Sequence, residues 1–402
     1  MIFVTGIVPD SFGVGVVHPI LKKGKPADQC VSYRQITVST TFCKLFESLI
    51  FDEIALRCTT PDDQFGFKKH SGREHVHSVL ANFLIDADKN GDLLVFGALD
   101  VSRSFDSGIH GHVLLKALQR GVSSCILSPV YSMYNKLSAV ILIPSPSGTF
   151  PSKEMLSVKK GVRQGGKTSP SLFNNAIIEA QQVIKPSCFF HGINLSLLNF
   201  ADDILHVSRS ISLFQQNYDS LAAAYKQIGL SFNESKTELL FFNRSKNELS
   251  INLSVEIGDT LIKPCDSLTY LGLPISSTLK DTRSALTNHL CSRVQASYGL
   301  LVANKYRFNR PLLARLYNAF TTLHLLALVP FWKIFTATEK KAICSAFYRY
   351  AKFLLRLPLW HSNGDISRKY KVTNPSIVIE RRISKFSNNV LRANHPWTSV
   401  IL

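Results

Sequence analysis

The chain has 402 residues, of which 45% are hydrophobic and 18% charged, so it is long enough for two or three subdomains with a sizeable core. Its eight scattered cysteines contain no C-x-x-C pair, which argues against a zinc site or a disulfide framework and suits a reducing compartment. No basic region precedes the first apolar residues, and Asp10 interrupts them, so we expect no signal peptide and an intracellular location.

The net charge of +18 is unevenly distributed. Residues 280–402 contain 20 Lys and Arg against 4 Asp and Glu, a net charge of +16, which leaves +2 for residues 1–279. A basic C-terminal third on a near-neutral body is typical of a nucleic-acid-binding appendage. The alternative, a generally solubilising surface, does not explain why nearly all of the net positive charge lies in the C-terminal third. We therefore expect a nucleic-acid partner.

The first quarter of the chain predicts a strand, a basic turn and two helices. The apolar run 16–20 leads into a turn with Lys22 and Lys23. Such a turn can meet a phosphate, although most are simply solvated. Apolar residues at helical spacing follow over 42–50, and a second helix is expected over 73–88.

The start of this second helix has a capping-box spacing, with Ser71 as the expected N-cap and Glu74 three residues later. His75 and His77 lie two residues apart on the same helix. Residues at that spacing do not share a helical face, so we do not interpret them as metal ligands.

A nearly continuous apolar run, 93–101, predicts a buried strand that carries Asp100 near its end. A lone carboxylate at that position is either a capped loop residue or a metal ligand. A helix is expected over 113–119, and the apolar residues of 130–143 are expected to enter a strand.

A basic, glycine-rich loop, 159–170, precedes a helix expected over 171–183. Loops of this kind let backbone N–H groups and cations approach a phosphate. As an isolated pattern, the loop is only suggestive of such a site.

Two adjacent aspartates, Asp202 and Asp203, lie between the apolar runs 193–200 and 204–207. Both runs predict strands, so the pair falls at a hairpin turn. Adjacent aspartates on a surface are often just solvated, but two charges between buried strands are costly unless a cation meets them. Mg²⁺ prefers carboxylate oxygens together with substrate phosphates. If Asp100 and Asp202 lie on adjacent strands, they could hold two metal ions for in-line phosphoryl transfer.

The remaining elements are mostly helical. A helix over 213–228 ends at Gly229, a strand follows over 239–242, and further helices begin near Ala285 and Pro311. A last helix begins with a capping box formed by Thr336 and Glu339.

The run 317–335 is apolar enough to suggest a membrane span. It contains His324 and Pro330, so a buried helix is the better interpretation and no membrane partner is expected.

Seven short motifs occur in order between residues 8 and 273, and together they resemble the reverse transcriptases of non-LTR (LINE-type) retrotransposons. The first is the N-terminal run that contains Tyr33-Arg34. The others are Gln64-Phe65-Gly66-Phe67, Leu99-Asp100 with Phe105-Asp106, Arg163-Gln164-Gly165 with Ser169-Pro170, Phe200-Ala201-Asp202-Asp203, Asn233 with Lys236-Thr237, and Tyr270-Leu271-Gly272.

The resemblance implies a metal centre and a set of catalytic residues. Asp100 and Asp202 match the family's metal ligands, Asp203 lies beside them, and the backbone carbonyl of Val101 is a further candidate ligand. Two Mg²⁺ ions, with Mn²⁺ as the alternative, would activate a primer 3′-hydroxyl and stabilise the pyrophosphate leaving group. Lys236 matches the lysine thought to protonate pyrophosphate, which is general-acid work.

The resemblance also implies the residues that bind substrate. Arg34 would hold the triphosphate, with Lys22 and Lys23 as lesser candidates. Phe105 matches the position that contacts the 2′ carbon of the sugar, although spacing alone would make it a core phenylalanine. The incoming dNTP would also contact Gln164 and Gly165, and nucleic acid would contact Tyr270, Leu271 and Gly272.

The fold implied is α+β, a right-hand polymerase. Fingers and palm with an antiparallel palm sheet occupy residues 1–276, and a basic helical thumb with a C-terminal extension occupies 277–402. The implied function is RNA-directed DNA polymerisation with an RNA template, a DNA primer and dNTPs, and a nuclear location is implied by the resemblance alone. Two alternatives are a catalytically inactive remnant that binds nucleic acid and, more weakly, a Mg²⁺ phosphotransferase that is not a polymerase.

Overall fold

The computed structural model describes the chain apart from residues 103, 146, 245–253, 259 and 304. Two compact units interleave along the sequence. Unit 1 comprises Met1–Phe67, Asp100–Lys185 and Gln216–Lys236, and unit 2 comprises Lys68–Leu99, Pro186–Gln215 and Thr237–Leu402.

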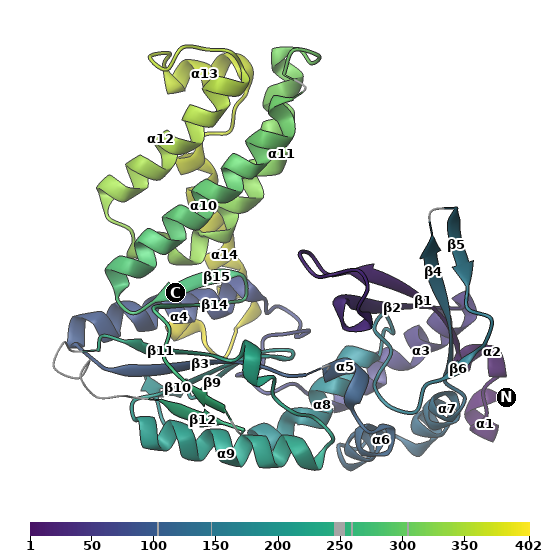
Figure 1. Cartoon of the computed structure of the whole chain (residues 1–402). Helices are drawn as coiled ribbons and strands as arrows, with labels where there is room; N and C mark the ends of the chain where they lie inside the picture. The colour runs from purple at the N-terminus through teal and green to yellow at the C-terminus, as the bar shows by residue number, and fades with distance from the viewer. Residues whose placement is uncertain (103, 146, 245–253, 259, 304) are drawn as a thin grey trace. The chain divides into compact units, whose positions relative to one another are not determined.

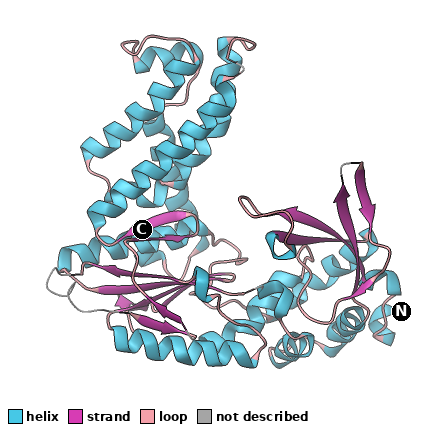
Figure 2. Cartoon of the chain, in the orientation of Figure 1, coloured by secondary structure: helices cyan, strands magenta, loops and turns pink. Residues whose placement is uncertain are grey.

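Unit 1 contains a five-stranded sheet with helices around it (Figure 2). The hairpin β1–β2 pairs antiparallel, and β4 runs parallel to β1 and antiparallel to β5 and β6. The strands are β1 (Val14–Leu21), β2 (Tyr33–Ser39), β4 (Ser138–Ser145), β5 (Gly148–Pro151) and β6 (Leu156–Ser157). The α-helices are α1 (Ile2–Thr5), α2 (Asp10–Gly13), α3 (Thr41–Arg57), α5 (Ser104–Ser107), α6 (His110–Gln119), α7 (Ser124–Asn135), α8 (Ser169–Gln181) and, from Gln216 on, α9 (Ile211–Gln227), with 3-10 turns η1 (Cys30–Ser32) and η2 (Glu234–Lys236).

The strand expected over 130–143 is wrong in its first half, because residues up to Asn135 belong to α7 and β4 begins only at Ser138. Val130, Met133 and Tyr134 are buried, and their spacing of three and four residues places them on one helical face. Neighbouring helices cover that face, so tertiary packing decides against the β-propensity of the run.

Unit 2 is built on a four-stranded sheet in the order β11-β3-β10-β9. Leu94, Val95 and Phe96 of β3 are fully buried, as the continuous apolar run predicts. The strands of this sheet are β3 (Leu94–Asp100), β9 (Leu197–Phe200), β10 (Asp203–Ser208) and β11 (Glu238–Phe242), and the smaller pairs are β7 (Phe189–Phe190) with β8 (Ile193–Asn194), β12 (Val255–Ile257) with β13 (Thr260–Ile262), and β14 (Ser267–Tyr270) with β15 (Leu273–Ser276).

Helix α4 (Arg73–Asn90) confirms the expected helix but not its expected N-cap. Gly72 precedes the helix, and among the residues that the structure describes no side chain caps it. The hydroxyl of Ser71 instead lies 3.0 Å from Nε2 of His395, and Glu74 binds Arg382. These partners come from the far end of the chain, so a local pattern could not predict them.

The C-terminal part of unit 2 is helical (Figure 1). The helix α10 packs against α11 and α12, and it buries Leu286, Leu290 and Val294. The elements are α10 (Leu279–Val302), α11 (Arg310–Ala327), the 3-10 helix η4 (Val329–Ile334), α12 (Ala337–Leu354), α13 (Asn363–Tyr370), α14 (Pro375–Ala393) and α15 (Thr398–Ile401).

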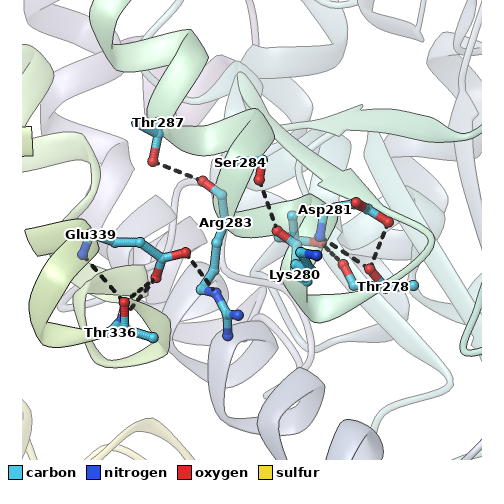
Figure 3. Close-up of polar contacts among 9 residues, drawn as sticks. Thr278, Lys280, Asp281, Arg283, Ser284, Thr287, Thr336 and Glu339 are labelled. Atoms are coloured by element: carbon cyan, nitrogen blue, oxygen red, sulfur yellow. Dashed lines mark hydrogen bonds and ion pairs between the residues drawn. The ribbon is translucent and has the colours of Figure 1, made fainter. Parts of the chain in front are cut away.

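The starts of α10 and α12 are tied together (Figure 3). Thr278 caps α10 by accepting a hydrogen bond from the backbone N–H of Asp281 at 3.0 Å. The predicted capping box of α12 is confirmed, since Thr336 and Glu339 exchange both of its hydrogen bonds. Nε of Arg283 on α10 lies 3.2 Å from a carboxylate oxygen of Glu339, so one carboxylate serves the cap and joins the two helices.

The apolar run 317–335 is divided between the end of α11 and η4, and nine of its nineteen residues are buried, among them Tyr317, Leu325 and Phe331. Among the described residues, no helix combines the length and the apolar character that crossing a membrane requires. The expected class, α+β with antiparallel strand pairs followed by helices, is confirmed. The division of function between 1–276 and 277–402 stays a prediction.

Candidate active site

The Asp202–Asp203 pair lies at a tight hairpin, as predicted. Phe200 of β9 pairs with Asp203 of β10, which leaves Ala201 and Asp202 as the turn residues. Ala201 is buried and has a φ of 58°, a conformation that favours glycine. Strain of this kind is concentrated at functional sites. Asp202 is half-buried and Asp203 is exposed.

Tyr270 supports this hairpin from within unit 2. Its hydroxyl donates a hydrogen bond of 2.7 Å to the backbone carbonyl of Leu198, and its side chain is only 3% exposed. Burial, together with the negative charge of Asp203, holds the pKa of Tyr270 well above its usual value, so it remains a donor. A buried ring cannot lie against a nucleic acid, so of the three contacts predicted for this motif only those of the turn residues Leu271 and Gly272, whose φ angles are positive, stay predictions.

In unit 1, the structure brings together Asp100 and Lys236, which are 136 residues apart. Nζ of Lys236 lies 2.8 Å from Oδ2 of Asp100. The backbone holds this pair in place, because the N–H of Asn233 donates to the Asp100 carbonyl and Val101 forms an isolated β-bridge with Phe232. The Asp100 side chain is 34% exposed, so its carboxylate remains accessible.

The strand order places β3, which ends at Asp100, next to β10, which begins at Asp203. Among the described residues, no group of three or more His, Cys, Asp and Glu side chains is arranged to hold a metal. Mg²⁺, however, usually takes only one or two protein carboxylates and completes its shell with substrate phosphates and water. The carboxylates of Asp100 and Asp202 are therefore the right kind of donor for this ion.

The loop that carries Gln164 and Gly165 lies against β2. The Gln164 carbonyl accepts a hydrogen bond from the N–H of Thr37 at 2.8 Å, and its side-chain amide donates to Asp106 at 2.9 Å. Gly165 has a φ of 121°, and a Cβ there would lie 2.7 Å from the Thr37 carbonyl oxygen. Only glycine fits this backbone path, so the position predicted to touch the nucleotide is also one where the chain tolerates no side chain.

Phe105 is half-buried in α5. Its ring stacks on Phe173 with centroids 4.6 Å apart and meets the edge of Phe67 at 6.1 Å. Its backbone carbonyl accepts a hydrogen bond from Val162 at 2.7 Å. The ring thus contacts other core rings and is also partly exposed. This fits both interpretations made from the sequence, a core phenylalanine and a residue that contacts the 2′ carbon of the sugar.

The predicted triphosphate contacts lie on the β1–β2 hairpin. Arg34 is exposed on β2, opposite Ile20. Lys23 is exposed in the connecting turn, whereas Nζ of Lys22 donates to the Val31 carbonyl at 3.0 Å. Arg34 and Lys23 are therefore the more available cations.

Two buried charged residues support the glycine-rich loop: Arg163, which the motif contains but to which the sequence assigned no role, and Glu47, which sequence reasoning missed. Arg163 is 9% exposed, and its guanidinium donates to the Gly13 carbonyl and to the Cys43 sulfur. Glu47 is 1% exposed and accepts hydrogen bonds of 3.2 Å from the Lys167 N–H and from a threonine hydroxyl. Burial raises the pKa of Glu47. In the sequence, the signal for a buried Glu47 was its position among the apolar residues of α3.

The chain is similar to several known proteins. The family model described as reverse transcriptase (RNA-dependent DNA polymerase) matches residues 20–275. A probable RNA-directed DNA polymerase from transposon BS of Drosophila melanogaster is 26% identical over 319 residues, which cover 75% of this chain and 33% of that protein. The RNA-directed DNA polymerase from mobile element jockey of Drosophila funebris is 23% identical over 311 residues, 74% of this chain and 33% of that protein.

A Pol polyprotein from the type-1 retrotransposable element R2 of Popillia japonica is 21% identical over 211 residues, 51% of this chain and 29% of that protein. This chain thus spans about a third of the length of these curated relatives. Among solved structures, apo telomerase from Candida tropicalis aligns with a TM-score of 0.45 at 13% identity, covering 98% of this chain and 70% of that one.

Proposed function

Because this chain belongs to the reverse transcriptase (RNA-dependent DNA polymerase) family, we propose that it copies an RNA template into DNA. In this proposal, deoxynucleotides are added to the 3′-hydroxyl of a primer, in the manner of non-LTR retrotransposon enzymes, and the enzyme acts in the nucleus. The observation that carries the proposal is the sheet order: β3, ending at Asp100, is the neighbour of β10, which follows Asp202 directly.

Asp100 and Asp202 would hold the divalent ions, with Asp203 and the Val101 carbonyl as further oxygen donors. When bound, two Mg²⁺ ions supply Lewis-acid activation of the primer hydroxyl and neutralise the charge of the leaving pyrophosphate. The chain holds Asp100 at the end of β3 and Asp202 in the tight turn between β9 and β10, and backbone hydrogen bonds on either side limit the movement of both residues. A preorganised carboxylate pair needs little reorganisation during the reaction.

Lys236 would act as the general acid. Its ammonium already lies 2.8 Å from Asp100, so a proton donor is held beside the proposed metal-binding carboxylate. Its proton would pass to an oxygen of the leaving pyrophosphate as the bond from the α-phosphorus to that oxygen breaks. General acids of this kind typically contribute about 10²–10⁴-fold to rate.

The nucleotide would be positioned by unit 1. Arg34 and Lys23 are exposed cations for the triphosphate, and Gln164 with Gly165 would pack beside the base and sugar. Phe105 of α5, whose backbone carbonyl accepts a hydrogen bond from Val162 at the start of that loop, would lie beneath the 2′ carbon.

The test is primer extension on an RNA template with Mg²⁺ and dNTPs. Asp202→Asn should abolish extension and leave template binding largely unchanged, because the carboxylate would hold metal and not the duplex. The matched control is Asp266→Asn, an exposed aspartate of unit 2 outside this sheet, which should retain activity. Substantial extension by Asp202→Asn would disprove the assignment. A wild-type chain that binds RNA tightly but never extends a primer would instead identify an inactive remnant.

A further inference from the structure

Two buried charged side chains attach the segment 163–168 of the glycine-rich loop to the rest of unit 1. Arg163 is the first residue of this segment, and Glu47 on α3 meets its last two residues. Gln164 and Gly165, which are proposed to contact the incoming nucleotide, lie between the two points of attachment. The path of the segment therefore depends on side chains that are too deeply buried to touch a nucleotide themselves.

The far end of the segment is attached to Glu47. This carboxylate accepts hydrogen bonds of 3.2 Å from the backbone N–H of Lys167 and from the hydroxyl of Thr168. Gly166 lets the backbone come this close, because a Cβ there would lie 2.9 Å from Oε1 of Glu47. Glu47 and Thr168 are each 1% exposed, so water hardly competes for these contacts.

The near end of the segment is attached through Arg163. Its guanidinium donates to the Gly13 carbonyl and, at 3.4 Å, to the sulfur of Cys43. Cys43 and Glu47 lie four residues apart on α3, so they share a face of this helix. One face of α3 thus contacts both ends of the segment, and β2 holds its middle through a backbone hydrogen bond from Thr37.

The energetics favour a single path for the segment. A buried carboxylate is costly unless hydrogen-bond donors surround it. Burial raises the pKa of Glu47, and the hydrogen bonds from Lys167 and Thr168, followed by the charge of Arg163, oppose that shift. These donors belong to the segment itself, so moving the segment away would leave the buried carboxylate with fewer donors. The observed path is therefore favoured before any nucleotide arrives.

We propose that Glu47 and Arg163 are positioning residues for the nucleotide: they preorganise the segment 163–168, so that Gln164 and Gly165 receive a dNTP without first having to be ordered. This inference rests on the proposed function in naming a dNTP as the ligand. A site whose competent conformation falls to a tenth of its population binds its ligand about tenfold more weakly. Loss of the attachment should therefore weaken dNTP binding and leave the chemical step nearly unchanged.

The first experiment follows the segment itself by amide hydrogen exchange and requires no polymerase activity. Glu47→Leu removes the carboxylate and should speed exchange of the Lys167 amide by about tenfold or more. Glu47→Gln keeps a carbonyl acceptor for that N–H and should restore most of the protection. Unchanged exchange at Lys167 in a folded Glu47→Leu chain would overturn the proposal.

Two further variants test the attachments separately. Thr168→Val removes one hydroxyl from the buried contact and is milder than Glu47→Leu, so it serves if the leucine variant does not fold. It should also speed exchange at Lys167, and no change there would argue against the attachment at Glu47. Arg163→Met removes the guanidinium at the near end and should speed exchange at Thr37, whose N–H donates to the next residue of the segment. Unchanged exchange at Thr37 would refute the role of Arg163.

The second experiment measures dNTP affinity in a complex of the full chain with an RNA template and a primer that ends in a dideoxynucleotide, so that no bond can form. Glu47→Leu should raise the Kd for the matching dNTP about tenfold. On an extendable primer, its KM should rise similarly and its kcat should change much less.

The matched control is Ile54→Ala. Ile54 is fully buried about two turns further along α3 and takes no part in the attachments described above. This variant should lower the melting temperature and keep the Kd for dNTP. An equal rise in Kd at an equal loss of melting temperature would contradict the proposal, because general destabilisation would then explain the effect of Glu47→Leu.

Three outcomes separate this inference from the proposed function. If Glu47→Leu speeds exchange but leaves the Kd for dNTP unchanged, the segment is anchored without positioning a nucleotide, and the inference fails. If wild type binds dNTP in a manner that depends on Glu47 but never extends a primer, the proposed function fails and the positioning role stands. A wild-type complex that binds no dNTP would overturn both. Thermal melting of every variant checks that it is folded.

Discussion

Replacing Phe105 with valine decides whether this ring selects the sugar or only fills the core. The ring stacks on Phe173 at 4.6 Å, and such a pair contributes about 0.5–1.5 kcal/mol beyond its buried area. Phe→Ala in a core costs about 3–5 kcal/mol, so loss of a half-buried ring to the larger valine should destabilise the fold by about 1–3 kcal/mol. If the exposed edge lies under the sugar, the smaller side chain should also admit a 2′-hydroxyl.

The assay is the ratio of kcat/KM for a ribonucleotide and its deoxynucleotide in primer extension. Phe105→Val should raise the relative use of ribonucleotides at least about tenfold, which corresponds to about 1.4 kcal/mol of barrier. Phe173→Leu is the matched control, because it removes the stacking partner from the buried α8 and leaves Phe105 in place. An unchanged ratio in Phe105→Val with a large fall in melting temperature would refute the sugar-selecting role. An equal change of the kcat/KM ratio in Phe173→Leu would also refute the sugar-selecting role.

Three further predictions test the site and the fold. Lys236→Gln should lower kcat at least about a hundredfold with little change in template affinity, as expected for loss of a general acid, and single-turnover kinetics would check this. Gly165→Ala should destabilise the chain by about 1–3 kcal/mol and raise KM for dNTP, since its φ of 121° is strained for alanine and its methyl group would meet a carbonyl oxygen of β2 at 2.7 Å. Thermal melting and steady-state kinetics measure these two effects. Thr336→Ala should cost about 1 kcal/mol through loss of the capping box and speed hydrogen exchange at the start of α12.

The local features of the site were predictable from the sequence because each depends on neighbouring residues. A short, continuous apolar run with polar residues at its borders is typical of a strand buried on both faces, and β3 ends at Asp100 as that run predicts. The hairpin at Asp202 follows from two apolar runs that meet at a polar pair. The seven motifs in order identified the family, and the match over residues 20–275 confirms it.

The tertiary structure alone decided which distant residues meet and which side chains are buried. The partner of Lys236 lies 136 residues away in the sequence, and the carboxylate that neutralises Arg382 lies 308 residues away. Helix and strand periodicities relate only residues that are close in sequence, so they cannot predict such pairs. Tyr270, expected at the nucleic acid, lies beneath the hairpin because its ring fills the space under β9 and its hydroxyl finds a backbone carbonyl there. Periodicity and motif order predict the local structure that a segment can form by itself. Burial and long-range pairing depend instead on which other segments pack around it.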